Sequence, residues 1–335
     1  MMENNKLLQD AFGRKHDYLR ISITEHCNLR CTYCMPEEGI KLTPKPHLMT
    51  ADEIVSVARD FVDLGVTKIR LTGGEPLVRK DAKEILLRLG KLGVNLTITT
   101  NGILIPDFIE TFKEAGIQDI NVSIDSLVKD KFNAITRRNY FDIVLENINL
   151  LLHHEFKVKL NIVLIKSFND NEINDFILLT KNKNVQVRFI EFMPFTGNQW
   201  DRSKLVSFAE IMETVQAGYQ LNEIERLQDA PNDTAKNFRI RTHKGSFAII
   251  SSVTNPFCGT CNRIRLTADG KLKNCLFSNS ETELLPAMRA GESILPLIRQ
   301  NLLAKQAIRA GMDDESKFGD PVMFSRNRSM IAIGG

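Results

Sequence analysis

The feature that most constrains the fold is an alternation of β-branched apolar runs with helix-like patterns, which continues through the first two thirds of the chain. Strand-like runs lie at Tyr18–Thr24, Lys68–Leu71, Asn95–Thr100, Asp119–Ile124, Lys157–Ile165 and Val185–Glu191. Helical patterns lie between them at Ala51–Leu64, Ala82–Gly90, Pro106–Ala115, Phe141–His153 and Asn171–Lys181. About six strand–helix units predict an α/β fold with a parallel sheet, as in a partial (β/α)6 TIM-like barrel. Such folds place their chemistry in loops at the carboxyl ends of the strands.

The alternation ends after Met193, so we place a domain boundary in this region. Residues 1–229 are expected to form the barrel core, and residues 230–335 a C-terminal α+β extension. The expected later elements are a loop at Pro194–Ser203, a helix at Phe208–Ala217, a polar connection at Ala230–Asn237, strands at Ser246–Ser251 and Arg263–Thr267, a turn at Asp269–Gly270 and a helix around Glu292–Leu303. The terminal segment Ser325–Gly335 ends in two glycines and is expected to be mobile.

The composition bounds the class of protein and its partners. With 335 residues, 43% of them hydrophobic, the chain can bury a large core. The opening stretch Met1–Gln9 is polar, and no later apolar run is long enough to cross a bilayer, so we expect a cytoplasmic protein with no membrane partner. A net charge of +3 is close to balanced, which argues against a general nucleic-acid partner. Any recognition of anions must therefore be local.

The six cysteines fall into two groups of three, which favours metal chemistry over disulfides. Cys27, Cys31 and Cys34 directly follow the first predicted strand with the spacing C-x3-C-x2-C. Three thiolates can hold three irons of a four-iron four-sulfur (4Fe–4S) cluster and leave the fourth iron open to a small molecule. The alternatives are three unrelated thiols, or a zinc site completed by His26 or His47.

The second group, Cys258, Cys261 and Cys275, can leave one iron open in the same way. Zinc is the competitor here, because C-x2-C is a common zinc pair and His243 could supply a fourth ligand. Arg263 and Arg265 follow on a predicted strand, where alternate residues share a face. Because arginine binds phosphate oxygens in a fork, this pair predicts an anionic ligand beside the second group, although surface arginines are the commoner case.

The first cysteine motif, with Tyr33 before its last cysteine, resembles the radical S-adenosylmethionine (SAM) superfamily. The resemblance implies a 4Fe–4S cluster whose open iron binds SAM, which is cleaved to a 5'-deoxyadenosyl radical. Tyr33 belongs to the family's SAM site. Thr72-Gly73-Gly74-Glu75-Pro76 follows the second strand, and Gly74 matches the family position that contacts the methionine amino group. Ser123 and Met193, each at a strand end, resemble further SAM contacts of the family.

Both cysteine groups, the Asn-Arg-x-Arg-Leu-Thr segment at 262–267 and the terminal Gly-Gly together resemble the GTP 3',8-cyclase family of molybdenum cofactor biosynthesis, from about Arg14 to the end of the chain. The resemblance implies two 4Fe–4S clusters, SAM at the first and the guanine of GTP at the second. The implied GTP contacts are Arg20, Arg70, Thr99, Lys159 (or its neighbour Lys157), Arg263 and Arg265. The implied catalytic set is Arg20, Arg263, Arg265, Gly334 and Gly335.

The reaction that the resemblance implies is removal of the ribose 3' hydrogen of GTP, bonding of that carbon to C8 of guanine and reduction to (8S)-3',8-cyclo-7,8-dihydroguanosine 5'-triphosphate, which makes the enzyme a lyase. The implied partners are an electron donor such as flavodoxin or ferredoxin, the downstream cyclic pyranopterin monophosphate synthase, and a second copy in a homodimer. One rival is a different radical SAM enzyme, such as a peptide-modifying maturase. Another is a zinc-stabilised nucleic-acid binder. The chain has only four Tyr and one Trp on which bases could stack, which disfavours that alternative.

Overall fold

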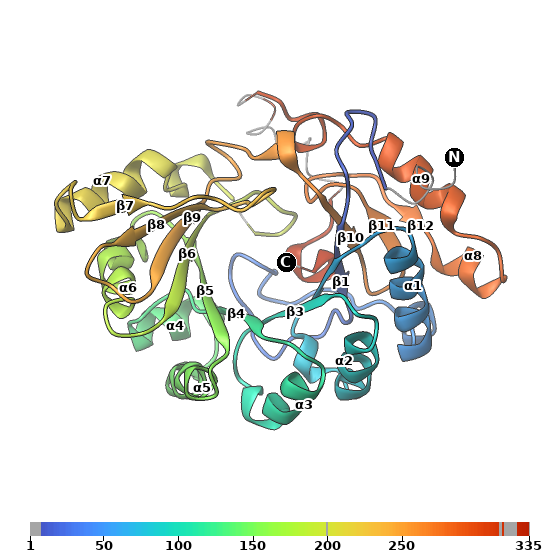
Figure 1. The fold of residues 1–335 in the computed structure, drawn as a ribbon, viewed down its shortest axis with the longest axis horizontal. Helices are drawn as coiled ribbons and strands as arrows, with labels where there is room; N and C mark the ends of the chain where they lie inside the picture. The colour runs from blue at the N-terminus through green and yellow to red at the C-terminus, as the bar shows by residue number, and fades with distance from the viewer. Residues whose placement is uncertain (1–7, 199, 315–316, 318–326, 335) are drawn as a thin grey trace.

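The computed structural model describes residues 8–198, 200–314, 317 and 327–334. Within them, twelve strands form one sheet with helices on its outer side (Figure 1). The strands are β1 (Tyr18–Ser22), β2 (Lys68–Thr72), β3 (Asn95–Thr100), β4 (Asp119–Ser123), β5 (Lys157–Leu164), β6 (Val185–Glu191), β7 (Ile224–Arg226), β8 (Lys236–Ile240), β9 (Ser246–Ile250), β10 (Arg263–Leu266), β11 (Lys271–Lys273) and β12 (Thr282–Glu283). The α-helices are α1 (Ala51–Asp63), α2 (Ala82–Gly90), α3 (Ile109–Glu114), α4 (Lys129–Thr136), α5 (Phe141–His153), α6 (Ile173–Leu179), α7 (Phe208–Gly218), α8 (Leu285–Arg289), α9 (Leu295–Leu303) and α12 (Met330–Ile333).

The central six strands run parallel in chain order, which confirms the predicted partial barrel. The full order is β12-β11-β10-β1-β2-β3-β4-β5-β6-β9-β8-β7. The later part of the chain therefore extends the sheet at both ends: β10 pairs parallel with β1, and β9 pairs parallel with β6. The remaining pairs at the two edges are antiparallel.

The strands have one apolar and one polar face, and this alternation positions the site. In β5, Val158, Leu160 and Ile162 are buried in the apolar core, whereas Lys159 and Asn161 belong to the opposite face. The apolar faces pack under the surrounding helices. Helix α1, for example, begins at a capping box formed by Thr50 and Glu53 and buries one apolar side. The polar faces consequently line the concave side of the sheet.

Two segments differ from the expectation. The polar connection expected at Ala230–Asn237 already enters β8 at Lys236, because the backbone there pairs with β9. The end of the chain, expected to be mobile, contains a helix in the part that the structure describes: residues 330–333 form α12, with Ile331 and Ile333 buried. Residues 325 and 326 of the expected segment lie outside the described residues. Gly335 lies outside the described residues. No helix in the described part of the chain has the length and apolar character needed to cross a membrane.

Candidate functional site

Strand pairing lines up cationic side chains along the polar face of the sheet. Arg20 on β1 is the neighbour of Arg265 on β10 and of Arg70 on β2. Further along the sheet, on the same polar face, Lys159 on β5 lies next to Gln186 on β6. Arg188 occupies this face two residues further along β6. The register thus gathers residues from distant parts of the sequence, including four of the predicted GTP contacts.

The clustered positive charges lower one another's pKa values. Burial lowers the pKa of Arg265 well below its ordinary value, and the charges of Arg20 and Arg263 lower it further. Burial lowers the pKa of Arg188 to about 10, and the charge of Arg70 acts in the same direction. Because like charges repel most strongly where water is excluded, an anion bound among these side chains would relieve the repulsion.

The positive charge of this face also favours the negatively charged form of Tyr18. Burial alone would raise the pKa of its phenol, but the charges of Arg70, Arg20 and Lys68 outweigh burial and lower the pKa to about 6. Arg70 Nε donates a hydrogen bond of 2.5 Å to the Tyr18 hydroxyl oxygen. A phenol with so low a pKa marks a region that favours negative charge.

Four buried polar atoms on this face have no hydrogen-bond partner within the described residues. They are Arg20 Nε, Arg263 Nη2, Asn121 Oδ1 and Asn161 Oδ1. Buried polar groups are nearly always satisfied in folded proteins, so a cluster of unsatisfied ones is typical of a site that a polar ligand completes. Donors and acceptors are both present, as binding of a nucleotide requires.

The remaining predicted GTP contacts lie on the same face. Arg70 Nη1 donates to Thr99 Oγ1 over 3.3 Å, which joins β2 to β3. Lys159 Nζ bonds Asp119 Oδ1 at 2.7 Å, and burial lowers its pKa with help from Arg188. Lys157 lies on the same face of β5 but is exposed, so the structure places Lys159 nearer the cationic cluster.

The first cysteine group lies in the loop that follows β1. Burial raises the pKa of Cys27 to about 11 and that of Cys34 to about 12, and the pKa of Cys31 lies well above its ordinary value. The thiols of Cys27 and Cys34 also raise the pKa of Cys31 electrostatically, and Cys27 raises that of Cys34, so the fold brings the three together. The donor set fits a 4Fe–4S cluster, because bound iron would hold as thiolates three thiols that are otherwise neutral.

Gly74 and Tyr33, two predicted SAM contacts, support the cysteine loop. A Cβ at Gly74 would lie 2.4 Å from the carbonyl oxygen of His26, so only glycine lets the loop after β2 approach so closely. The Tyr33 hydroxyl donates to Asp125 Oδ2 over 2.9 Å, which ties the loop to the end of β4. Ser123 also ends β4, and Met193 packs in a small apolar cluster beside Phe195.

The second cysteine group lies beside the cationic cluster. The thiols of Cys258 and Cys261 raise the pKa of Cys275 electrostatically, in addition to burial, so this group also comes together. Burial would raise the pKa of Cys261, but Arg263 and Lys305 outweigh it and lower the pKa to about 6. Lys305 Nζ lies 3.5 Å from the Cys261 sulfur. This set of thiols also fits a cluster, with one thiolate already favoured by its cations.

The structure separates His243 from these cysteines. Its ring accepts or donates a 2.8 Å hydrogen bond with Thr180 Oγ1 and packs against Tyr219, near the opposite edge of the sheet. In the described residues, no group of three His, Cys, Asp or Glu side chains could hold a metal ion between them. In an iron–sulfur cube each thiolate binds its own iron, so the cysteines need not converge on one point.

The C-terminal tail, residues 327–334, lies between the two cysteine groups. Arg265 Nη1 donates to the Gly334 carbonyl oxygen over 2.7 Å, and the backbone N–H of Ile331 bonds the Cys34 sulfur. Gly334 has φ 79°, and a Cβ there would lie 2.5 Å from Thr72 Oγ1. Only glycine fits this position. The last residue, Gly335, falls beyond the part of the chain that the structure describes.

Sequence reasoning missed Arg188, Tyr18, Lys305 and Arg14. Arg14 Nη1 donates to the carbonyl oxygen of Cys258 over 2.8 Å and holds the second cysteine loop. Arg188 could have been found, because Val185-Gln186-Val187-Arg188 alternates apolar and polar residues and so puts the arginine on the polar face. Lys305 and Arg14 are brought to the site only by the fold.

Comparison with known proteins identifies the family to which this site belongs. Residues 21–180 match the family model of the Radical SAM superfamily, and residues 185–310 match that of Molybdenum Cofactor Synthesis C. The mitochondrial GTP 3',8-cyclase of Arabidopsis thaliana is 49% identical, covering 98% of this chain and 84% of that protein. The GTP 3',8-cyclase of Listeria monocytogenes is 40% identical, covering 98% of this chain and the full length of that protein.

Human molybdenum cofactor biosynthesis protein 1 is 46% identical over 97% of this chain, which spans only 51% of that protein's length. Among solved structures, Streptococcus suis SuiB bound to S-adenosylmethionine superposes with a TM-score of 0.62 at 16% identity, covering 95% of this chain and 72% of SuiB, a likeness of fold. The two cysteine groups, the cationic face and these relatives agree: the chain belongs to the GTP 3',8-cyclase family of the radical SAM superfamily.

Proposed function

We propose that this chain is a lyase that converts GTP to (8S)-3',8-cyclo-7,8-dihydroguanosine 5'-triphosphate, the first step of molybdenum cofactor biosynthesis. The observation that carries the proposal is the position of Arg263 and Arg265. They lie on β10, next to Arg20 on β1 and beside the second cysteine group. A polyanion bound by these arginines would thus lie next to the second group.

The cationic face would bind the triphosphate. Arg20, Arg70 and Arg265 are adjacent across three strands, and arginine binds phosphate oxygens with two parallel hydrogen bonds. Lys159 and Arg188 approach from β5 and β6 and would hold the other side of the ligand. Because the strands fix these side chains, the ribose and base would be oriented without rearrangement of the protein.

The two cysteine groups would hold two 4Fe–4S clusters, the first with Cys27, Cys31 and Cys34 and the second with Cys258, Cys261 and Cys275. When bound at the first group, the cluster and SAM would supply the radical that removes the 3' hydrogen of GTP. The protein's task is orientation and exclusion of water. Gly74, Tyr33, Ser123 and Met193 would shape the SAM pocket, and the tail would close the space between the clusters.

The partners and the cellular location remain predictions from the family. We propose an electron donor such as flavodoxin or ferredoxin, delivery of the product to cyclic pyranopterin monophosphate synthase, assembly as a homodimer and a cytoplasmic location. The domain boundary between residues 229 and 230 also remains a proposal. Strands from beyond it pair with both ends of the central sheet.

The test is reconstitution with iron and sulfide under anaerobic conditions, followed by incubation with SAM, reductant and GTP. We expect about eight irons per chain, deoxyadenosine that depends on GTP, and a cyclised guanosine nucleotide. Cys31→Ala should abolish SAM cleavage, whereas Arg265→Ala should retain cleavage and lose the cyclised product. Arg239→Ala, at an exposed position on β8 of the same sheet, is the matched control and should leave both products unchanged.

Two results would contradict the proposal at different levels. SAM cleavage that is indifferent to GTP, with about eight irons bound, would keep the radical SAM chemistry but remove GTP as substrate. Zinc bound in place of iron would remove the whole mechanism.

A further inference from the structure

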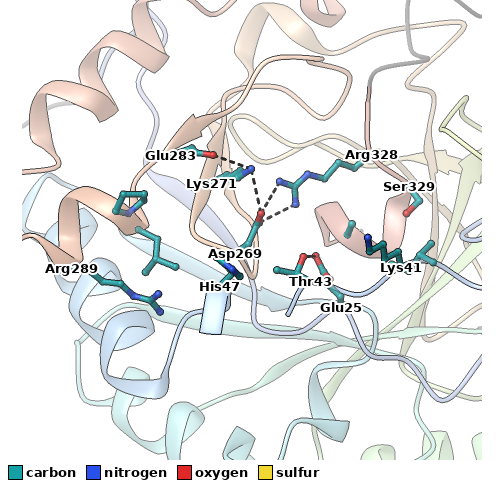
Figure 2. A pocket seen from close by; sticks show the side chains of 14 residues that line it. Glu25, Lys41, Thr43, His47, Asp269, Lys271, Glu283, Arg289, Arg328 and Ser329 are labelled. Carbon is teal, nitrogen blue, oxygen red and sulfur yellow. Dashed lines mark hydrogen bonds and ion pairs between the residues drawn. The ribbon is translucent and has the colours of Figure 1, made fainter. Parts of the chain in front are cut away.

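A cavity of about 730 Å³ opens beside the tail (Figure 2). Its walls come from the loop after the first cysteine group, from the turn at Asp269, from α8 and from the first residues of the tail. Arg328 reaches across one wall toward Asp269, and Arg289 lines the opposite side. Two arginines therefore line the cavity, and only Arg328 belongs to the tail.

Arg328 forms a two-pronged ion pair with the turn between β10 and β11. Its Nη1 and Nη2 atoms donate to the two carboxylate oxygens of Asp269 over 2.9 and 2.8 Å. Nη2 also donates to Glu281 Oε2 over 2.6 Å. All three side chains are largely buried, with exposed fractions of 23%, 9% and 14%. Such forked, charge-assisted pairs fix an orientation as well as a distance.

The residue before Arg328 adds a second attachment. Asn327 is buried, and its Oδ1 accepts a 3.1 Å hydrogen bond from Lys273 Nζ. Its Nδ2 donates to the Leu276 carbonyl oxygen over 3.0 Å, and its own backbone carbonyl accepts from Thr196. The chain is thus held at two consecutive residues just before α12 begins.

Helix α12 begins directly after this attachment. It has four residues and no side-chain hydrogen bond at its N-terminal cap, and helices this short are unstable alone. Its contacts are nevertheless specific, since Ile331 bonds Cys34 and Gly334 accepts from Arg265. A small displacement at Arg328 would be passed directly to the space between the two cysteine groups.

We propose that Arg328 is a positioning residue for the cyclisation, and that its ion pairs with Asp269 and Glu281 form a latch that seats α12 and Gly334 between the two cysteine groups. The proposal rests on the proposed function of the chain for its catalytic consequence. Its structural part, that the latch seats the tail, does not depend on that function.

Two measurements on the reconstituted full-length protein test it. Hydrogen–deuterium exchange over residues 327–334 should be about tenfold faster in Arg328→Gln than in the unmodified chain, since a charge-assisted attachment is lost. In turnover with GTP, the same variant should form more deoxyadenosine per cyclised nucleotide and show a lower kcat with a nearly unchanged KM for GTP. Arg328→Lys keeps the charge and should restore part of both properties.

The chain supplies a matched control and a second variant. Arg289 lines the same cavity and pairs with Glu53 over 2.7 Å, and its hydrogen bonds go to residues 46, 48 and 53, not to the described residues of the tail. Arg289→Gln should therefore change neither measurement. Asp269→Asn weakens the latch from its other side and should reproduce Arg328→Gln. Bound iron, counted in every variant, shows whether both cysteine groups are still assembled.

Each outcome bears on one part of the inference. Unchanged exchange in both Arg328→Gln and Asp269→Asn would overturn the latch. Faster exchange with an unchanged ratio of deoxyadenosine to product would overturn the positioning role while the latch stands. If the unmodified chain forms no cyclised nucleotide at all, the proposed function fails, and the exchange measurement still decides whether Arg328 seats the tail.

Discussion

At the scale of single residues, Tyr18 shows how strongly the site favours negative charge. Its phenol has a pKa of about 6 because Arg70, Arg20 and Lys68 outweigh the effect of burial. The ionised phenol stabilises the fold, and this contribution is fully present above the ordinary tyrosine pKa and is lost as pH falls through about 6. A bound phosphate would compete with the phenolate for the same cations and raise the pKa again.

We therefore expect GTP to bind more weakly as pH rises through about 6, because binding then requires Tyr18 to take up a proton. Tyrosinate absorbance in the ligand-free protein should titrate near that pH and move upward when GTP is added. Tyr18→Phe should remove both the absorbance change and this part of the pH dependence of affinity. A Tyr18→Phe variant with an unchanged pH dependence of affinity would contradict the assignment.

Some residues of the site were predictable and others were not, for a physical reason. The cysteines and the pair Arg263 and Arg265 carry local signals, namely short spacings and strand alternation, and the structure brings them together. Lys305 could not be found from the sequence around it, because its partner Cys261 lies in a loop far away in the sequence. Only the fold brings the end of α9 to that loop. The roles of these residues in catalysis stay predictions.

At the scale of elements, the loop after β2 shows how glycine sets the distance between two loops. Gly74 N donates to the Thr24 carbonyl oxygen over 2.8 Å, and Glu75 N donates to that of His26 over 2.8 Å. Buried Glu75 then accepts from Thr100 Oγ1 over 2.8 Å, with a pKa that burial raises to about 7. The ends of three neighbouring strands are thereby joined around the first cysteine group.

Gly74→Ala should push these loops apart, because the added Cβ would lie 2.4 Å from a backbone oxygen that cannot move aside cheaply. The variant is expected to lose the first cluster and to bind about four irons instead of about eight. Gly259→Ala is the control, since a Cβ there meets nothing within 4 Å although it lies in the second cysteine loop. Iron and sulfide content after reconstitution is the measurement, and equal iron in the two variants would refute the argument.

The elements that sequence reasoning missed are short or depend on distant partners. β7, β11 and β12 have two or three residues each, too few to display an alternation. α12 was not expected, because the terminal segment closes with two glycines and was expected to be mobile. Its order comes from burial of Ile331 and Ile333 and from the attachment at Arg328. Long, periodic elements such as α1 and β5 were predictable within a few residues.

At the scale of the whole molecule, a net charge of only +3 conceals a strongly cationic interior. Assembling that interior costs free energy, and a polyanion that binds the folded state alone would recover it. Inorganic tripolyphosphate at a hundred times its dissociation constant should stabilise the fold by about 2.7 kcal/mol. For a chain of this length, that corresponds to an upward shift of the unfolding temperature by roughly 4 °C.

Thermal unfolding followed by fluorescence checks this expectation, with sodium chloride at equal ionic strength as the control. The shift should shrink in Arg188→Ala and at high salt, because fewer or weaker charges then face the anion. An equal shift with sodium chloride would show that the stabilisation has nothing to do with the cationic face.

The pairing of β1 with β10 also bears on how the protein is made. Tyr18 of β1 pairs with Arg263 of β10, so an early strand waits for one that the ribosome produces much later. Until then β1 exposes an unpaired edge, a common starting point for aggregation. Chains that stall before Arg263 should therefore be captured by chaperones and degraded. Cys275 of the second cysteine group follows β10 in the sequence, so the proposed second cluster can assemble only after the strand that pairs with β1 has been made.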